Sequence, residues 1–475
     1  MVVEAYQLFL PKPPFFSPSF PSPPPHFSSF LFHPSSFSLA LFHSDSSISL
    51  YSPFSLSSFP PPLTTLPPPI SAASFLLLRN PNPTTLFLIT SPVSGGASVL
   101  LRFYILNSAR KSFAPARVVC NQSDLEFDES KFGMVFRVSH GVSVKLVGDV
   151  NVFALYSISN GKVWVFAVKQ LGGEEVKLMK CAVIDCSLPV FSISVSFGFL
   201  ILGEDNGVRV FPLRPLVKGR VKKEKGVITK SLNSDKMEIK RLPLRNGMMI
   251  HGMNGVNAEI CSADGGKLMC IETDQKLTSN VVLDERIENR AVSGAGTLSA
   301  KLRSVRLRQD SREGIANFMA FKNKDDNFES IKIPAKSAKA IGIQALSSTK
   351  FLILDSEGNL HLLFLATSVG SGTPYHMKQL THNMKVRKLA VLPDSSTRSQ
   401  TVWISDSLHT LHMIAVTDMD ASVNQTDRKD PAEMLVQTSV AQAIFSNEKV
   451  QEIEALSANT VLLLGQGSMF AYAIS

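Results

Sequence analysis

From about residue 132 onward the chain is a series of short apolar runs separated by turn residues. One unit recurs, in which an apolar stretch, a tight turn and a second apolar stretch follow one another, as in 153–168 and 199–213. Gly or Asn-Gly stands at most of the turns because tight hairpin turns need positive φ. The pattern predicts β-hairpins with turns near 161, 207, 266, 358, 407 and 467.

The spacing of these hairpins predicts the architecture. Successive turns are 46, 59, 92, 49 and 60 residues apart, and the 92-residue gap leaves room for one more hairpin around 310–314. Seven hairpins at a period of about 40–60 residues are typical of a β-propeller, in which each blade is a four-stranded sheet. The expected fold is therefore all-β, a seven-bladed propeller.

Closure of the ring is also predicted from the pattern. The chain stops at Ser475, directly after the third strand of the last unit. The apolar run Phe132–Val138 precedes the first unit and is expected to supply the missing fourth strand, so that no sheet edge is left bare.

One turn resembles a known family. Asn206-Gly-Val-Arg-Val-Phe-Pro-Leu213 is similar to the Asp-Gly-x-Val-Arg-Val-Trp-Asp-Leu ending of a WD40 repeat, and 161–164 and 358–361 are looser versions. The resemblance covers 132–475, but no unit has the Trp-Asp or Gly-His pair of that family. It implies a divergent WD40-like propeller that lacks the family's Asp–His hydrogen bonds. It also implies a rigid, non-catalytic platform on which other proteins assemble.

The N-terminal region has a different composition. Residues 1–70 contain 16 Ser, 16 Pro, 11 Phe and 9 Leu, with Glu4, Lys12 and Asp45 as the charged residues. Proline at this density opposes helix and sheet, so we expect a low-complexity segment over 1–95, a linker over 96–131 and the propeller over 132–475. Disorder or translated leader sequence is favoured for 1–95. A plastid or mitochondrial transit peptide, which fits best over 86–120, is the alternative.

The net charge of +9 is concentrated in few places. Residues 214–246 alone hold eleven basic and three acidic residues, and a second cluster lies in 301–312. The ordinary interpretation of such a run is a solvated loop between blades. The alternative is non-specific contact with nucleic acid phosphates, or nuclear import. Its candidate residues are Lys218, Arg220, Lys222, Lys223, Lys225, Arg303, Arg306 and Arg308.

Other chemistry finds little support. No phosphate-binding loop, nucleophile elbow or zinc-protease motif occurs, so we expect no enzyme, cofactor or metal site. Five cysteines without a CxxC pair indicate reduced thiols, and no apolar run approaches a membrane span. The sequence therefore predicts an intracellular scaffold in the nucleus or cytoplasm, or in a plastid if 1–120 is a transit peptide. Other proteins are expected to dock on a rim of the propeller.

Overall fold

The structure is a computed structural model. It describes residues 3–8, 26–56, 62, 64–79, 82–107, 109–120, 122, 125, 127–218, 304–310, 316–321, 337–365, 375–392, 399–419 and 435–475. These belong to a unit formed by 1–221 and 297–475, whereas 222–296 lie outside the described residues.

Seven sheets make up the described part of this unit, and we number them as blades 1 to 7 in chain order. The four main strands of each blade pair antiparallel, and β10 (Arg117–Val119) adds a parallel pair with β16 in blade 3. Blade 1 contains β2 (Phe27–His33), β3 (Ser38–His43), β4 (Ile48–Tyr51) and β5 (Thr64–Leu66). Blade 2 contains β6 (Ala72–Leu78), β7 (Thr84–Val93), β8 (Ser98–Asn107) and β12 (Gly133–Arg137), with β9 (Ser112–Pro115), β11 (Phe127–Asp128) and the 3-10 turn η1 (Ser94–Gly96). Blade 3 contains β13 (Val144–Gly148), β14 (Val152–Ser157), β15 (Lys162–Gly172) and β16 (Glu175–Asp185).

The remaining blades follow the same order of strands. Blade 4 contains β17 (Ser192–Ser196), β18 (Phe199–Glu204), β19 (Gly207–Pro212) and β21 (Asn317–Ala320), and helix α1 (Leu213–Lys218) follows β19. Blade 5 contains β22 (Ala340–Ser347), β23 (Lys350–Asp355), β24 (Leu360–Leu365) and β25 (Tyr375–Leu380). Blade 6 contains β26 (Lys388–Val391), β27 (Ser399–Ser405), β28 (Thr410–Met419) and β29 (Leu435–Phe445). Blade 7 contains β30 (Glu452–Ser457), β31 (Thr460–Leu464), β32 (Met469–Ile474) and β1 (Val3–Leu8).

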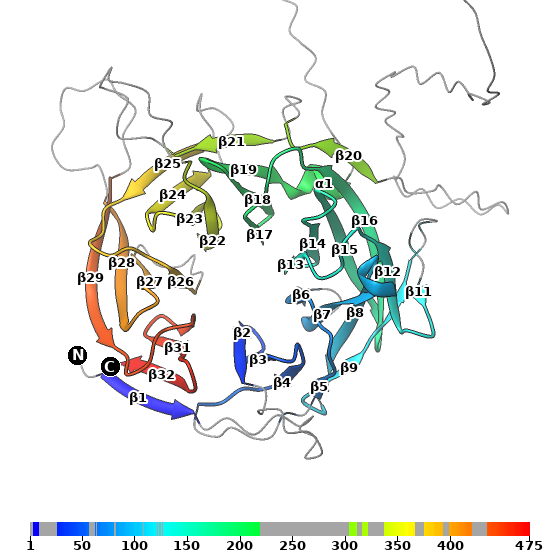
Figure 1. The fold of residues 1–475 in the computed structure, drawn as a ribbon, viewed down its shortest axis with the longest axis horizontal. Helices are drawn as coiled ribbons and strands as arrows, with labels where there is room; N and C mark the ends of the chain where they lie inside the picture. The colour runs from blue at the N-terminus through cyan, green and yellow to red at the C-terminus, as the bar shows by residue number, and fades with distance from the viewer. Residues whose placement is uncertain are drawn as a thin grey trace, which may run out of the picture. The chain divides into compact units, whose positions relative to one another are not determined.

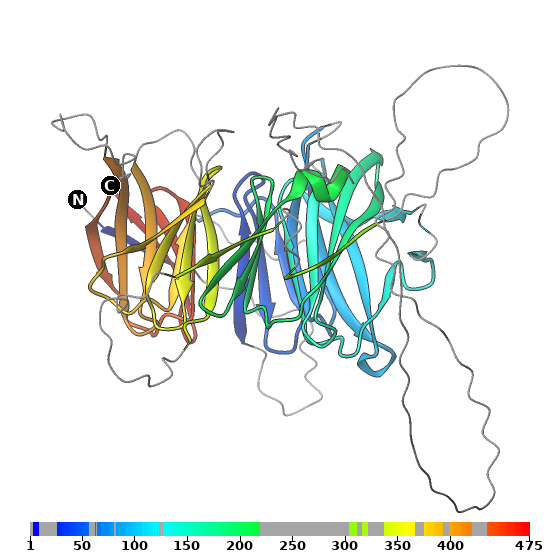
Figure 2. The ribbon, with the colours of Figure 1, turned by 90° about the horizontal axis from the view of Figure 1, so that it is seen from above.

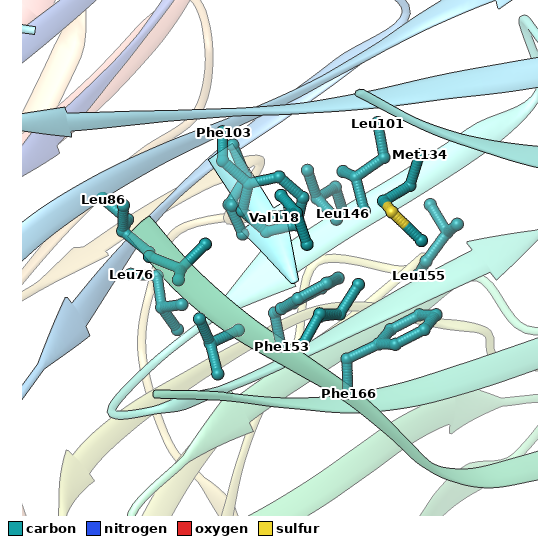
Figure 3. Packing of buried hydrophobic residues seen from close by; sticks show 14 of the residues in the cluster. Leu76, Leu86, Leu101, Phe103, Val118, Met134, Leu146, Phe153, Leu155 and Phe166 are labelled. Carbon is teal, nitrogen blue, oxygen red and sulfur yellow. The ribbon is translucent and has the colours of Figure 1, made fainter. Parts of the chain in front are cut away.

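The blades form a closed ring (Figure 1). The first strand of each blade contacts the first strand of the next, from β2 through β6, β13, β17, β22 and β26 to β30 and back to β2. Among the described residues, one buried apolar cluster lies between each pair of neighbouring blades. Figure 3 shows the cluster between blades 2 and 3, which includes Met134 and the stacked rings of Phe153 and Phe166. The seven-bladed architecture predicted from the hairpin spacing is confirmed.

The ring is closed by a strand other than the expected one. β1 pairs antiparallel with β32, from Val3 opposite Ile474 to Leu8 opposite Met469, so the two ends of the chain share blade 7. The predicted closing run Phe132–Val138 instead contains β12, which pairs with β8 inside blade 2. The prediction was wrong because it assigned no strand to the first residues of the chain.

The boundary of the propeller also differs from the prediction. Blades 1 and 2 lie within 27–137, where a low-complexity segment and a linker were expected, so strands begin long before residue 132. The prolines of 1–70 are unevenly spread, because residues 26–52 contain Pro34 alone, in the turn between β2 and β3. Residues 9–25, where prolines are dense, lie outside the described residues.

Five of the predicted hairpin turns are confirmed, namely those near 161, 207, 358, 407 and 467. The turn near 266 lies outside the described residues. The additional hairpin around 310–314 was wrong. Its flanking strands β20 (Val305–Arg308) and β21 join different sheets, β20 pairing with β16 and β21 with β19. Apolar pattern alone does not tell which neighbour a short strand pairs with.

Candidate interaction surfaces

Each blade presents turns at two faces of the ring. We call the face with the turns between first and second strands the first-turn face, and the face with the turns between second and third strands the second-turn face. Rigid turns of this kind are where binding residues concentrate in all-β scaffolds.

An unusual turn lies on the first-turn face of blade 4. Phe197 and Gly198 connect β17 to β18, with Ser196 paired to Phe199, and their φ values are 50° and 82°. Two positive φ values define a type I′ turn, which favours Asn-Gly because a side chain crowds the backbone there. Phe197 is nevertheless placed at the first position, and it is 41% exposed.

Phe197 lines a groove of about 370 Å³, which we call the Phe197 groove. Its walls come from the end of β6, the turn between β13 and β14, the Phe197 turn and α1. The green helix α1 is seen at one edge of the blades in Figure 2. The lining residues are Arg79, Asp149, Val150, Val152, Val195, Phe197, Gly198, Leu213, Arg214 and Val217.

Hydrogen bonds join the three turns around this groove. The Asp149 carboxylate accepts a bond of 2.9 Å from the Phe197 N–H, and the Arg79 N–H donates to Asn151 Oδ1 at 3.0 Å. The Leu213 N–H donates to the Gly198 carbonyl at 2.8 Å, which ties α1 to the Phe197 turn. The groove is therefore formed by elements that hold one another in place.

The groove is lined by two positively charged side chains and one carboxylate. Burial raises the pKa of Asp149, although the backbone N–H groups of Phe197 and Val150 and the charge of Arg79 act against this rise. Arg79 and Arg214 are exposed, and no hydrogen bond or ion pair of either guanidinium is seen within the described part of the chain. The groove thus combines apolar walls with two available cations, Arg79 and Arg214, and one carboxylate, Asp149, which already accepts a hydrogen bond from the Phe197 turn.

A second surface lies on the second-turn face around blade 3. Val142, Ile158 and Leu188 are 55%, 49% and 50% exposed and come from three neighbouring loops. The Ile158 N–H donates to the Ser143 carbonyl at 3.0 Å, and the Leu188 N–H donates to Gln309 Oε1 at 2.9 Å. We call these three residues the apolar row. β14 runs from the Phe197 groove to the apolar row, so the two surfaces lie at opposite faces.

The basic candidates from the sequence divide into three groups. Lys218 is the exposed last residue of α1, beside the Phe197 groove. Arg306 and Arg308 are both exposed on β20, with Leu307 buried between them. Arg220, Lys222, Lys223, Lys225 and Arg303 lie outside the described residues.

The structure brings Arg306 and Arg308 together but does not place Lys218 with them. β20 pairs with Ala182–Asp185, the end of β16 at the second-turn face, whereas α1 begins at the first-turn face. Lys180 is a third basic side chain at this edge. Burial lowers the pKa of Lys180, and the nearby charge of Arg306 lowers it further. Contact of these residues with nucleic acid stays a prediction.

Blade 5 contains a buried Asp–His pair that the missing family motifs did not lead us to expect. The Asp355 carboxylate accepts a 2.9 Å hydrogen bond from His361 Nε2 and bonds from the N–H groups of Glu357 and Asn359 at 2.9 and 2.8 Å. The His361 ring stacks on Phe321 at a centroid distance of 4.0 Å. The pair stiffens a turn, and the spacing Asp-x₃-Asn-x-His is the sequence signal that could have revealed it.

Reactive or metal-binding groups are scarce among the described residues. They include no group of three or more His, Cys, Asp or Glu side chains that could hold a metal ion. Burial raises the pKa of the Cys181 thiol to about 11 and that of Cys186 to about 12, with Glu204 and Asp185 adding to the latter rise. In the same part of the chain, no helix has the length and apolar character needed to cross a membrane.

Two tryptophans behave as core residues. Trp403 is fully buried between blades 6 and 7, and Trp164 packs against the cluster between blades 2 and 3.

The sheets and their turns define the class of fold: a closed β-propeller with seven blades. No family model and no curated protein matches the chain. Similar solved structures include the β-propeller domain of Cps50 (Swd1) from Myceliophteria thermophila, with 8% identity, a TM-score of 0.45, and 95% of this chain and 97% of that chain covered.

Two further solved structures are similar at the same level. They are the WD40 repeats of RRP9, with 9% identity, a TM-score of 0.42 and 95% of both chains covered, and U3-55K, with 9% identity, a TM-score of 0.41 and coverage of 95% and 96%. Likeness at this level concerns the arrangement of strands and does not indicate what the chain binds.

Proposed function

We propose that this chain is a non-catalytic scaffold that binds other proteins at the faces of its propeller. The observation that carries the proposal is the apolar row, in which Val142, Ile158 and Leu188 are about half exposed on loops fixed by backbone hydrogen bonds. Burying the exposed half of each side chain in a complex would contribute roughly 1 kcal/mol per residue. Because the loops are already ordered, little of this gain is lost to ordering them on binding.

The compartment proposed is the inside of the cell, in the nucleus or cytoplasm. The three cysteines within the described residues, Cys120, Cys181 and Cys186, are free thiols, which supports a reducing environment.

Binding to nucleic acid has narrower support. Arg306 and Arg308 are adjacent exposed cations on β20, and such a pair would contact phosphates without reading sequence. We keep this as the second candidate, and the same experiment separates the two.

The test is recovery of partners from cell extract by the tagged full chain, with and without nuclease. We expect discrete proteins that survive nuclease. The double variant Ile158→Ser/Leu188→Ser should bind them roughly thirty-fold more weakly, because two contacts of roughly 1 kcal/mol each are lost. Leu171→Ser is the matched control, because Leu171 is 47% exposed at the tip of the β15–β16 hairpin, away from the apolar row.

Equal recovery by wild type and the double variant would contradict the proposed surface. Loss of every partner on nuclease treatment would favour the second candidate. In that case Arg306→Gln/Arg308→Gln should reduce the nucleic acid retained, and added salt should reduce it steeply.

A further inference from the structure

We propose that the Phe197 groove binds an extended segment of a partner protein in which a large apolar side chain is flanked by carboxylates. The apolar side chain would contact Phe197 and the valines of the groove, and the carboxylates would pair with Arg79 and Arg214. The inference rests on the proposed scaffold function and names the chemistry of one partner.

Phe197 occupies an unfavourable position for an aromatic side chain. At φ 50° and followed by Gly198 at φ 82°, it stands where Asn would form the turn with less crowding. Its ring forms no aromatic pair with any described residue, and it is 41% exposed, so it serves neither the turn nor the core. Phe37 and Phe132 also have positive φ, but their rings pair with Phe32 and Phe127. The Phe197 ring lacks such a partner among the described residues, and contact with something outside the chain explains its place.

An apolar wall lies beside the Phe197 ring. Val195 and Leu213 are buried, and Val150, Val152 and Val217 complete a lining drawn from blade 3, blade 4 and α1. The volume of about 370 Å³ suits one or two side chains of a peptide. Because hydrogen bonds join the contributing turns, the groove exists before a partner arrives.

The charged side chains of the groove favour an acidic ligand. Arg79 and Arg214 lie on different walls of the groove, and Lys218 ends the helix that carries Arg214. Asp149, the acidic lining residue, already accepts a hydrogen bond from the Phe197 N–H. A purely apolar ligand would cover these guanidinium groups without pairing them, which costs affinity. A segment that carries carboxylates pairs them instead, and Arg forms the stronger, forked hydrogen bonds to carboxylates.

The variant Phe197→Asn makes this testable without harming the fold. It removes the ring and creates Asn-Gly, the preferred pair for this turn, so its unfolding temperature should equal or exceed that of the wild type. Phe37→Asn is the matched control. Phe37 also has a positive φ, 47°, and is 55% exposed in the first turn of blade 1.

The probe is a display library of unstructured peptides of about 12 residues, panned on the purified full chain. We expect the enriched peptides to combine Leu, Ile, Met or an aromatic residue with at least two Asp or Glu. Binding of an enriched peptide, measured by fluorescence anisotropy, should fall at least ten-fold in Phe197→Asn and in Arg79→Gln/Arg214→Gln. Phe37→Asn should bind as the wild type does, and amidation of the peptide carboxylates should weaken binding as the arginine variant does.

Several results would overturn the inference. Enriched peptides without acidic residues, or equal binding to Phe197→Asn, would show that the groove is not the site. A single-stranded oligonucleotide that displaces the peptide and binds Phe197→Asn normally would assign the arginines to nucleic acid. If no peptide is enriched while proteins are still recovered through the apolar row, this inference fails and the proposed function stands. If peptides bind as expected while the apolar row recovers no protein, the inference holds and the apolar row is not the docking surface.

Discussion

Replacing Asp355 with Ala should destabilise the protein far more than the same change in the matching turn of blade 6. The Asp355 side chain is 1% exposed and accepts hydrogen bonds from His361 Nε2, from Asn359 Nδ2 and from the N–H groups of Glu357 and Asn359. Removing it leaves His361 buried without its acceptor. An unsatisfied buried donor costs about 1–3 kcal/mol, and several donors lose their acceptor here. We expect about 3 kcal/mol in all.

Asp406→Ala is the control for this prediction. Asp406 occupies the corresponding turn and also precedes Ser, but it is only half-buried and accepts from the N–H groups of Leu408 and Thr410 at 2.8 and 3.3 Å. Its loss should cost about 1 kcal/mol. Urea unfolding followed by tryptophan fluorescence measures both variants. Equal losses, or a loss below about 1 kcal/mol for Asp355→Ala, would refute the reasoning that the buried network stabilises blade 5.

The Asp355 network also implies a pH dependence. Burial acts to raise the pKa of Asp355, but the hydrogen bonds from His361 and Asn359 outweigh it and hold that pKa below its ordinary value. Because the folded pKa is the lower one, the carboxylate stabilises the fold above its ordinary pKa, and this stabilisation is lost as the pH falls through the folded pKa. Asp355→Asn should lose this part of the acid dependence, and an unchanged profile would contradict it.

Three further predictions concern other parts of the ring. Burial lowers the pKa of His33 to about 4, so the neutral ring stabilises the fold above about pH 6.5. The free energy of unfolding should fall by up to about 3 kcal/mol on acidification to pH 4. His33→Asn should remove this pH dependence of the unfolding free energy in denaturant titrations. Gly203→Ala should cost more than about 2 kcal/mol, because its Cβ would collide with Ser192 Oγ and the Ala340 carbonyl; Gly172→Ala, with open space around it, is the control in thermal unfolding. Gln122→Ala should speed hydrogen exchange at the Lys180 amide, since the Gln122 side chain pairs with the Lys180 N–H and C=O at 2.6 and 2.9 Å; unchanged exchange would contradict this.

The hairpin pattern was sufficient to predict the fold class, because the blades repeat the same local pattern of two apolar strands joined by a tight turn. Runs such as 199–204 and 207–212 pair across Asn206-Gly207, and the turn chemistry there is local. Local signals of this kind can be recognised in a single sequence without an alignment. The spacing predicted only blades 3 to 7 at their observed places, and the count of seven included turns near 266 and 310–314 while blades 1 and 2 were missed.

The position of blade 1 could not be predicted, because its strands are built from serines as well as apolar residues. Ser38, Ser49 and Ser52 are buried, and they are satisfied by one another or by His43: Ser38 Oγ donates to Ser52 Oγ at 3.0 Å, and His43 Nε2 lies 2.8 Å from Ser49 Oγ. A composition count treats such serines as signs of disorder. Their pairing appears only once the strands are side by side.

The Phe197 groove was missed for a related reason. Ser-Phe-Gly-Phe at 196–199 is visible as a turn, but Arg79 and Asp149 reach it from other blades. The sequence singled out a run of basic residues that begins at Arg214, whereas the structure joins Arg214 to a distant arginine across an apolar wall. Contacts between blades form only when the blades assemble into the ring, so no single segment of the sequence predicts them.

The measurement that most directly tests this account compares the full chain with a chain of residues 132–475. The structure predicts that the shorter chain does not fold cooperatively, because it lacks blade 1, nearly all of blade 2 and the closing strand β1, leaving the first strands of blades 3 and 7 without their neighbours. A chain without residues 222–296, a separate unit, serves as the control and should keep a sharp thermal transition. If residues 132–475 unfold with the same cooperativity and temperature as the full chain, the propeller does not begin at β1 and the account is wrong.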